Sequence, residues 1–187
     1  ELLDRGSVHQ GAALEVKPLM WGNISDTCGK SEKNSVVLLL DRISDPHNVG
    51  AILRSAEVFG AQAVIGTQRH SAPETGALAK SASGTLERQP YLRVNNLSRS
   101  IEELKSLGFV VLGLDGLAEK TINEGINSFP IGPMAFILGA EGPGLRDKTK
   151  LYCDMLVKVP SFHGEGSLNV SNAAIIALYD IRHGKRL

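Results

Sequence analysis

The sequence predicts an α/β domain whose mostly parallel sheet is covered by helices on both faces. Short apolar runs alternate with helical patterns along most of the chain, which favours a parallel sheet over an antiparallel one. The apolar runs are nearly continuous, which indicates strands buried on both sides. Apolar residues make up 42% of the 187 residues, enough for one globular domain with a sizeable core. Because ligands bind beyond the carboxyl ends of parallel strands, we expect the functional residues in the turns after Leu40, Leu114, Leu138 and Val159.

The first half of the chain contains a leading segment and then alternating strands and helices. Residues 1–34 are polar with scattered glycines, so we interpret them as a linker in which residues 23–34 form a surface loop. The expected elements that follow are a buried strand at 36–40, a helix at 48–59, a strand at 61–66, a short helix at 75–83 and a strand at 91–94. The first of these helices has an apolar stripe, with Asn48 placed to cap its start and Gly60 at its end.

The second half repeats this alternation and ends in a long helix. The expected elements are a helix at 98–107, strands at 109–114 and 134–138, a helix at 145–152 and a strand at 155–159. Ser98 is expected to cap the helix at 98–107. The last helix has apolar residues at helical spacing over 170–181, and Ile175 and Ile176 make it apolar nearly all round. Such a helix is covered by its own core or by a partner subunit.

Composition restricts the classes of function. The formal net charge is zero, so any contact with a nucleic acid must be local or must be supplied by another domain. Aromatic residues are only 5% of the chain, which argues against base-stacking platforms. Cys28 and Cys153 have no metal-like or redox spacing, which favours a reduced setting, either the cytoplasm or an organelle matrix. We expect no metal site and no membrane span.

The turn after the first strand contains residues 45–50, Asp-Pro-His-Asn-Val-Gly, and leads to Arg54. Gly50 and Arg54 are four residues apart and therefore share one face of the predicted helix. A glycine one turn before an arginine leaves room for a ligand, and the start of a helix attracts anions. This pattern predicts a seat for one phosphate and its ribose. The alternative is an ordinary helix cap followed by a solvated arginine.

Two further turns combine glycines with polar side chains. Residues 139–145, Gly-Ala-Glu-Gly-Pro-Gly-Leu, permit a tight turn, and Glu141 within it needs a partner. Residues 166–171, Gly-Ser-Leu-Asn-Val-Ser, would place Ser167 and Asn169 on the cleft side if they are extended, with Leu168 on an apolar wall. The alternative for this third segment is helix capping by Asn169 or Ser171.

Together, in this order and at this spacing, the three segments resemble the motifs of the TrmH-like RNA ribose 2'-O-methyltransferases of the SPOUT superfamily. The resemblance covers residue 35 to the end of the chain. Residues 9–11 and 16–18 also look like the segment that precedes the catalytic domain in bacterial 23S rRNA guanosine 2'-O-methyltransferases, which have a further N-terminal RNA-binding domain. We therefore expect residues 1–34 to be the remnant that follows such a domain, and residues 35–187 to be the catalytic domain.

The resemblance implies a deep trefoil knot in the C-terminal part of the α/β fold, a homodimer, and S-adenosylmethionine bound in the knot without a metal. The residues that it assigns to the cofactor are Leu138, Gly139, Val159 and Leu168. The residues that it assigns to substrate and catalysis are Asn48, Arg54, Glu141, Ser167 and Asn169. Arg54 is expected to stabilise the developing alkoxide and the neighbouring phosphate, because an arginine stays protonated. Glu141 is expected to hold Arg54 or Asn48 in place.

The implied reaction is methyl transfer to a ribose 2'-hydroxyl of RNA, with a guanosine of large-subunit rRNA as the expected target. The alternatives are a tRNA ribose, a base nitrogen of tRNA, and a non-catalytic RNA-binding or ribosome-assembly module on the same fold. A nucleotide-dependent oxidoreductase is disfavoured, because residues 157–162 lack the acidic side chain that such sites place about 20 positions after their glycine turn.

Overall fold

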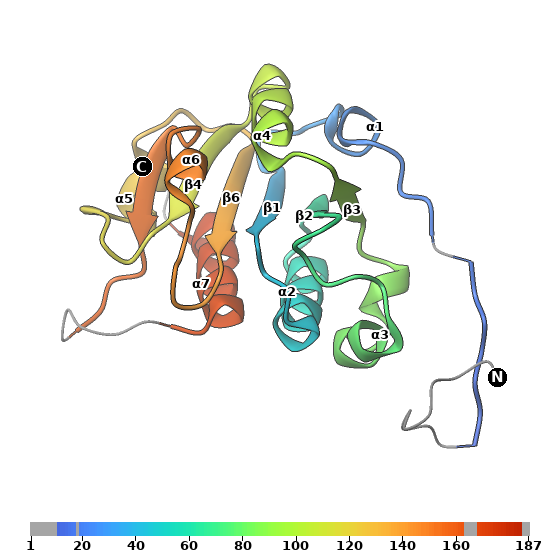
Figure 1. Cartoon of the computed structure of the whole chain (residues 1–187). Coiled ribbons are helices and arrows are strands. Elements are labelled where there is room, and N and C mark those ends of the chain that lie inside the picture. Colours follow the sequence, from blue (N-terminus) through green and yellow to red (C-terminus); the bar gives the residue numbers. More distant parts are fainter. Residues whose placement is uncertain (1–10, 18, 163–167, 185–187) are drawn as a thin grey trace.

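The computed structural model describes residues 11–17, 19–162 and 168–184, which build a seven-stranded sheet with helices on its two faces (Figure 1). The strands are β1 (Val36–Asp41), β2 (Ala63–Thr67), β3 (Tyr91–Val94), β4 (Val110–Leu114), β5 (Lys120–Thr121), β6 (Met134–Gly139) and β7 (Met155–Lys158). Their order across the sheet is β3-β2-β1-β6-β4-β7-β5, and every pairing is parallel. The α/β class with a parallel sheet is therefore confirmed.

The helices divide between two apolar layers. They are α1 (Ile24–Cys28), α2 (Pro46–Val58), α3 (Gly76–Ala82), the 3-10 helix η1 (Thr85–Glu87), α4 (Leu97–Ser106), α5 (Ile122–Asn127), α6 (Asp147–Lys150) and α7 (Val170–His183). Helices α2, α3, α5 and α7 pack in one core cluster, and α1 and α4 pack in the other (Figure 1). The sheet lies between these layers, so its carboxyl ends open onto the turns in which we expect the site.

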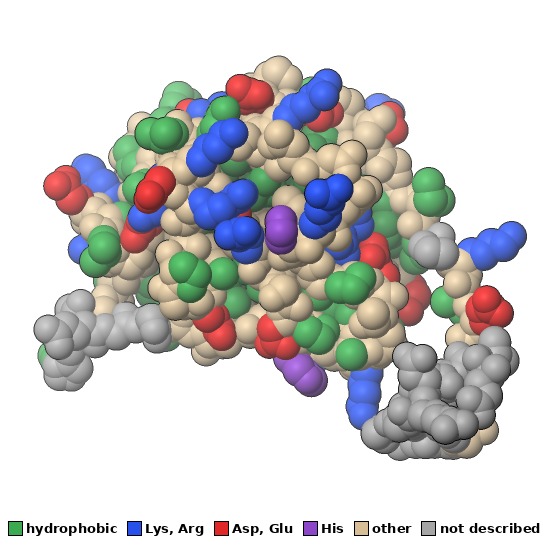
Figure 2. Space-filling model, in the orientation of Figure 1, with side chains coloured by type: hydrophobic (Ala, Val, Ile, Leu, Met, Phe, Trp, Pro, Cys, Tyr) green, Lys and Arg blue, Asp and Glu red, His purple; other side chains and the backbone are tan. Residues whose placement is uncertain are grey.

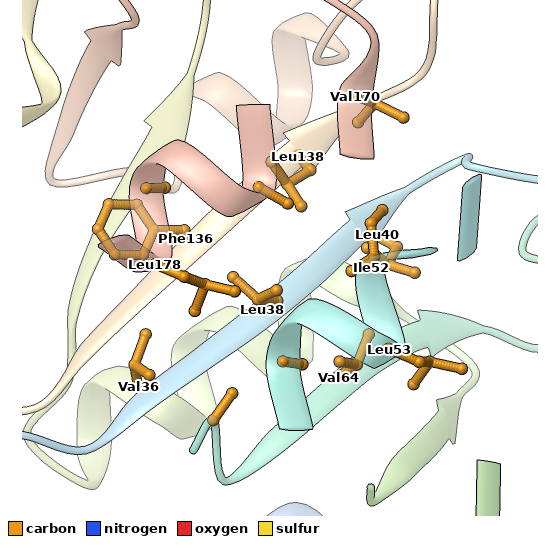
Figure 3. Packing of buried hydrophobic residues seen from close by; sticks show 14 of the residues in the cluster. Val36, Leu38, Leu40, Ile52, Leu53, Val64, Phe136, Leu138, Val170 and Leu178 are labelled. Atoms are coloured by element: carbon orange, nitrogen blue, oxygen red, sulfur yellow. The ribbon is translucent and has the colours of Figure 1, made fainter. Parts of the chain in front are cut away.

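Strand β1 is central and buried on both faces. Leu38 and Leu40 face α2 and α7 (Figure 3), whereas Val37 and Leu39 belong to the cluster of α1 and α4. Each of these side chains is fully buried, and burying one leucine stabilises a fold by about 2 kcal/mol. This two-sided burial explains why the strand has an uninterrupted apolar sequence.

Helix α1 corrects the prediction that residues 23–34 form a surface loop. Asn23 and Asp26 form a reciprocal capping box at its start, which satisfies main-chain N–H groups that a short helix would otherwise leave unpaired. Ile24 and Cys28 are buried in the core layer of α4. This part of the leading segment therefore belongs to the folded body.

Helices α4, α5 and α6 also differ from the sequence prediction: two have other ends, and one was not expected. Asn96, not Ser98, caps α4, because its side chain accepts the N–H of Arg99. The helix expected at 145–152 is only the four residues of α6, since Leu145 is buried in the core instead. Helix α5 was missed, although Thr121 and Glu124 form a capping box that the sequence already contains.

Arg182, near the end of α7, binds main-chain groups in the first third of the chain. Its guanidinium donates to the carbonyl oxygens of Phe59 (2.7 Å), Gly60 (2.7 Å) and Asn34 (2.6 Å). These carbonyls lie just after α2 and just before β1, so one side chain satisfies groups at two element ends.

Candidate active site

The turn after β1 frees the side chain of Asn48. Asp45, not Asn48, caps α2: its carboxylate accepts the N–H groups of His47 (3.1 Å) and Asn48 (3.3 Å). Pro46 then occupies the first helical position, where its fixed φ and missing N–H cost nothing. The predicted capping role of Asn48 is therefore wrong, and its amide is available for contacts across the site.

The turn after β6 is a tight loop with Glu141 at its tip. Ala140 and Gly144 form a bridge, with the N–H of Gly144 donating to the carbonyl of Ala140 at 2.9 Å. Gly142 and Gly144 have φ values of 82° and 67°, which glycine adopts without the cost that a side chain would bring. The loop thus folds back on the end of its own strand.

This loop packs without spare room against the sheet. A Cβ on Gly139 would overlap the main chain of Gly144 and Leu145, with the Gly144 carbonyl oxygen only 2.6 Å away. Gly113 on β4 likewise makes room for the side chain of Leu145, whose Cδ1 would lie 2.9 Å from a Cβ there. Two glycines therefore fix the position of the turn that carries Glu141.

Asn48, Glu141 and Asn169 form one hydrogen-bonded network at the carboxyl end of the sheet. The amide of Asn169 donates to Glu141 Oε1 at 2.6 Å and to Asn48 Oδ1 at 2.9 Å. Asn48 Nδ2 donates to the same Glu141 oxygen at 3.3 Å. The network thus joins three residues that lie 28 to 121 positions apart in the sequence, and Glu141 has the partner that its turn predicted.

Ser171 fixes the orientation of the Asn169 amide. Asn169 Oδ1 accepts the Ser171 N–H at 2.9 Å and the Ser171 hydroxyl at 2.6 Å, and it caps α7 in this way. The amide NH2 group must then point toward Glu141 and Asn48. The capping interpretation of this segment is therefore confirmed for Asn169, whose amide also contacts Glu141 and Asn48.

Asp41 and Arg146 anchor the loop, and the sequence analysis missed both. Asp41 ends β1 with a side chain that is 0% exposed, and it accepts Arg146 Nε at 2.7 Å and the Arg146 N–H at 3.1 Å. A carboxylate at the end of an otherwise apolar strand was the available signal, because a buried charge needs a partner. The pair attaches the turn after β6 to the neighbouring strand.

Gly50 does not leave the ligand space that its spacing from Arg54 predicted. A Cβ on Gly50 would lie 2.6 Å from Ser81 Cβ and 2.8 Å from Ala82 N, so this glycine makes room for α3. Arg54 is exposed on α2, six residues from Asn48, which is roughly 9 Å along the helix and on another side. Within the described residues, no hydrogen bond or ion pair joins its guanidinium to Asn48, Glu141 or Asn169.

The predicted cofactor residues lie along the ends of β6 and β7. Leu138 is buried, Gly139 and Val159 are half-buried, and the side chain of Leu168 is 49% exposed beside Asn169. Ser167, the fifth predicted polar residue, lies outside the described residues. The arrangement offers apolar walls next to a polar network, which suits a ligand with both kinds of surface.

The two cysteine thiols are poor nucleophiles. Burial raises the pKa of the Cys28 thiol to about 11 and that of Cys153 to about 12, so neither is a thiolate at neutral pH. No group of three His, Cys, Asp or Glu side chains among the described residues could hold a metal ion. No described helix is both long and apolar enough to cross a membrane.

Comparisons with known proteins agree with the motif resemblance. A model described as the SpoU rRNA Methylase family matches residues 35–179. The chain is 40% identical over 176 residues to 23S rRNA (guanosine-2'-O-)-methyltransferase RlmB of Pseudomonas putida, covering 92% of this chain and 70% of that protein. It is also 40% identical over 176 residues to an uncharacterized tRNA/rRNA methyltransferase of Synechocystis sp., covering 92% of this chain but only 45% of that protein.

A solved structure extends the likeness to the fold. The SpoU methyltransferase AviRb from Streptomyces viridochromogenes, in complex with the cofactor AdoMet, is similar with a TM-score of 0.70 and 28% identity. The match covers 80% of this chain and 57% of that one.

Proposed function

The chain belongs to the SpoU rRNA methylase family, and we propose that it transfers a methyl group from S-adenosylmethionine to a ribose 2'-hydroxyl of RNA. A guanosine of large-subunit rRNA is the proposed target, because RlmB relatives at about 40% identity are named for that reaction. The network of Asn48, Glu141 and Asn169 supports this reading most directly. We further propose that residues 35–187 form the catalytic unit. Helix α1 precedes this unit in the sequence and packs against it.

The residues at the ends of β6 and β7 fit the proposed cofactor. Val159 and Leu168 supply apolar surface of the kind that an adenine needs, beside a network that can receive polar groups, and the buried Leu138 backs this surface from the core. S-adenosylmethionine, when bound, supplies a methyl group already activated by a sulfonium. The task left to the protein is to hold a ribose hydroxyl in place and to stabilise its charge as the proton leaves.

We assign a separate role to each polar residue. The amide of Asn169 is oriented by Ser171 and positions the ribose, while Glu141 holds Asn169 and Asn48 together. Ser167 is proposed to assist Asn169. Arg54 stabilises the developing alkoxide and the adjacent phosphate, since a guanidinium remains protonated and carries a planar fork of donors. Its exposed position on α2 leaves it accessible to RNA.

Arg54→Ala is expected to retain cofactor binding and to lose methyl transfer by at least about 100-fold, because one donor at a developing oxyanion contributes on the order of 10²–10³ in rate. Arg54→Lys is expected to fail as well, because a lysine lacks the planar fork. Calorimetry with S-adenosylmethionine and transfer assays at saturating RNA would measure the two effects. Near-native transfer by Arg54→Ala would rule out this role.

We propose that the protein is a homodimer in which Arg54 of one protomer approaches the site of its partner. Exposed apolar side chains on α7 and at the end of α2 support this: Ile175 is 39% exposed, Tyr179 56% and Val58 78%. An isologous dimer would cover them. Sedimentation showing only a monomer at micromolar concentration would contradict the proposal.

A trefoil knot in the C-terminal part is also proposed. The chain leaves β7, which is two strands from β6, yet Asn169 returns to the turn after β6 and α7 packs beneath that strand. This return supports a crossing of the kind that a knot requires. An experimental structure in which the connection to α7 passes outside the loop between β6 and β7 would contradict it.

The reaction is tested by incubating the protein with methyl-labelled S-adenosylmethionine and either transcribed 23S rRNA or bulk tRNA. We expect label in the rRNA, in a dinucleotide that resists alkaline hydrolysis, because a 2'-O-methyl group blocks attack on the next phosphate. Label in tRNA would select the tRNA alternative, and label on a base would exclude ribose transfer. A folded protein that binds no S-adenosylmethionine would favour the non-catalytic module.

A further inference from the structure

Arg42 holds a backbone conformation that is unusual for an arginine. It follows β1 with φ at 64° and its side chain is exposed. Among the described residues other than glycine, positive φ occurs only there and at Ser83, which ends α3. The left-handed conformation costs a side-chain-bearing residue about 1–2 kcal/mol relative to the usual regions. An exposed arginine retained in this conformation points to a use for its charge.

Arg146 presents a second guanidinium, which is held by the residue directly before Arg42. Its main-chain N–H and Nε are bound by the buried Asp41, the residue directly before Arg42. The side chain of Arg146 is nevertheless 41% exposed, and within the described residues its two Nη groups have no hydrogen-bond partner. Asp41 thus orients an arginine whose remaining donors face outward, which lowers the entropy lost when an anion binds.

The turn after β2 adds Arg69 and His70 to the same region. Both are exposed, and the turn is joined to that of β1 by the N–H of Ala72, which donates to the carbonyl of Ile43 at 3.3 Å. Arg93 holds the turn from beneath, donating to the carbonyl oxygens of Thr67, Gln68, Ser71 and Ala72 at 2.6–3.1 Å. The two turns therefore form a fixed platform.

Neighbouring acidic groups offset only part of the charge of this platform. The buried Asp41 pairs with Arg146, Glu74 pairs with Arg93 at 3.1 Å and Asp45 caps α2, whereas Arg42 and Arg69 have no ion-pair partner among the described residues. Figure 2 shows Lys and Arg side chains, with a histidine among them, gathered in the middle of the face over β6, β1 and β2. Positive charge is thus concentrated locally on a chain whose net charge is zero.

We propose that Arg42, Arg69, His70 and Arg146 form a phosphate-binding surface for the RNA strand that flanks the methylated nucleotide. The inference rests on the proposed function for the identity of the polyanion. Asp41, the residue before Arg42, pairs with Gly139 across the β1–β6 ladder, and Gly139 precedes Glu141 by two residues, so the surface adjoins a turn of the candidate active site. A strand with its ribose at the site would pass over these donors, which contact phosphates without reading sequence.

The test uses Arg42→Gly in the whole chain, with binding of transcribed 23S rRNA measured from about 50 to 200 mM salt. We expect weaker binding by about fivefold and a salt slope smaller by about one unit, because one phosphate contact is lost. Thermal stability should stay the same or rise, since glycine accepts positive φ without strain. In methyl-transfer assays, the KM for RNA should rise by a larger factor than kcat falls. Arg69→Ala, in the other turn, should show the same pattern.

Lys33→Gly is the matched control. Lys33 is exposed before β1, at the opposite end of that strand, and the change also removes one positive charge and introduces glycine. If Arg42→Gly and Arg69→Ala bind RNA like Lys33→Gly, with the same salt slope, the surface is wrong even if methyl transfer proceeds. If RNA binding weakens as expected but the wild-type protein methylates no RNA, the proposed reaction fails and the surface stands.

Discussion

Gly139→Ala is expected to destabilise the fold by about 1–3 kcal/mol and to lower methyl transfer by on the order of 100-fold. The added Cβ would overlap the main chain of Gly144 and Leu145, and main-chain atoms cannot move aside as a flexible side chain does. The turn would have to shift, and it would carry Glu141 away from Asn48 and Asn169. The expected loss therefore reaches the site although Gly139 itself has no side chain.

Urea unfolding and methyl-transfer assays would measure the two consequences of Gly139→Ala, and calorimetry with S-adenosylmethionine would show whether the cofactor still binds. Gly76→Ala is the control, because a Cβ at that exposed position on α3 would have no neighbour within 4 Å. The control should be as stable as the wild type or slightly more stable, since alanine favours a helix. Equal stability and equal cofactor affinity for both variants would show that the turn is not tightly packed.

Asn169→Asp is expected to lower methyl transfer by on the order of 100-fold while leaving the fold intact. The change replaces the NH2 group that lies 2.6 Å from Glu141 Oε1 with an oxygen, so two carboxylates would face each other. The cap of α7 should survive, because an aspartate accepts the Ser171 N–H as well as an asparagine does. The effect should thus appear in single-turnover transfer and not in helix content.

A second substitution can test whether the loss of transfer comes from the lost hydrogen bonds of Asn169 or from the change of side chain as such. Adding Glu141→Gln to Asn169→Asp reverses donor and acceptor, and a flipped Asn48 amide can still join both. Partial recovery of transfer is expected from this pair. Asn127→Asp, on the exposed α5 pair with Asn123, is the charge-matched control and should keep full activity. Full activity of Asn169→Asp alone would exclude the network from the reaction.

The sequence predicted the sheet better than the helix ends. Strands buried on both faces have continuous apolar runs, so β1 and β6 were recognisable from residue type alone. Helix starts involve competition between adjacent polar residues, and Asp45 displaced Asn48 only because Pro46 fits the first helical position. Helix α1 depends on burial of Ile24 and Cys28 against α4, which local sequence does not reveal.

For the candidate site, the expected parallel sheet predicted which turns meet, but the sequence did not reveal every partner. Asn48, Glu141 and Asn169 were expected near one another because parallel strands place their following turns at one edge. Asp41 is recognisable as a carboxylate at the end of an apolar strand, but its partner Arg146 lies 105 positions away and no local pattern identifies it. Gly50 was misinterpreted because a glycine that admits a ligand and one that admits a neighbouring helix look alike in sequence.

The hydrogen bonds from Arg182 to main-chain groups beside α2 and β1, together with the pairing of β1 with β6, affect when the domain can fold during its synthesis. Neither the central strand nor the helix that follows it can complete its contacts until residue 182 has left the ribosome. Contacts that are so distant in sequence slow the search for the native state. Folding of this domain should therefore finish only after that residue has emerged, in one late cooperative step, and nascent chains released before residue 182 should be targets for chaperones and proteases.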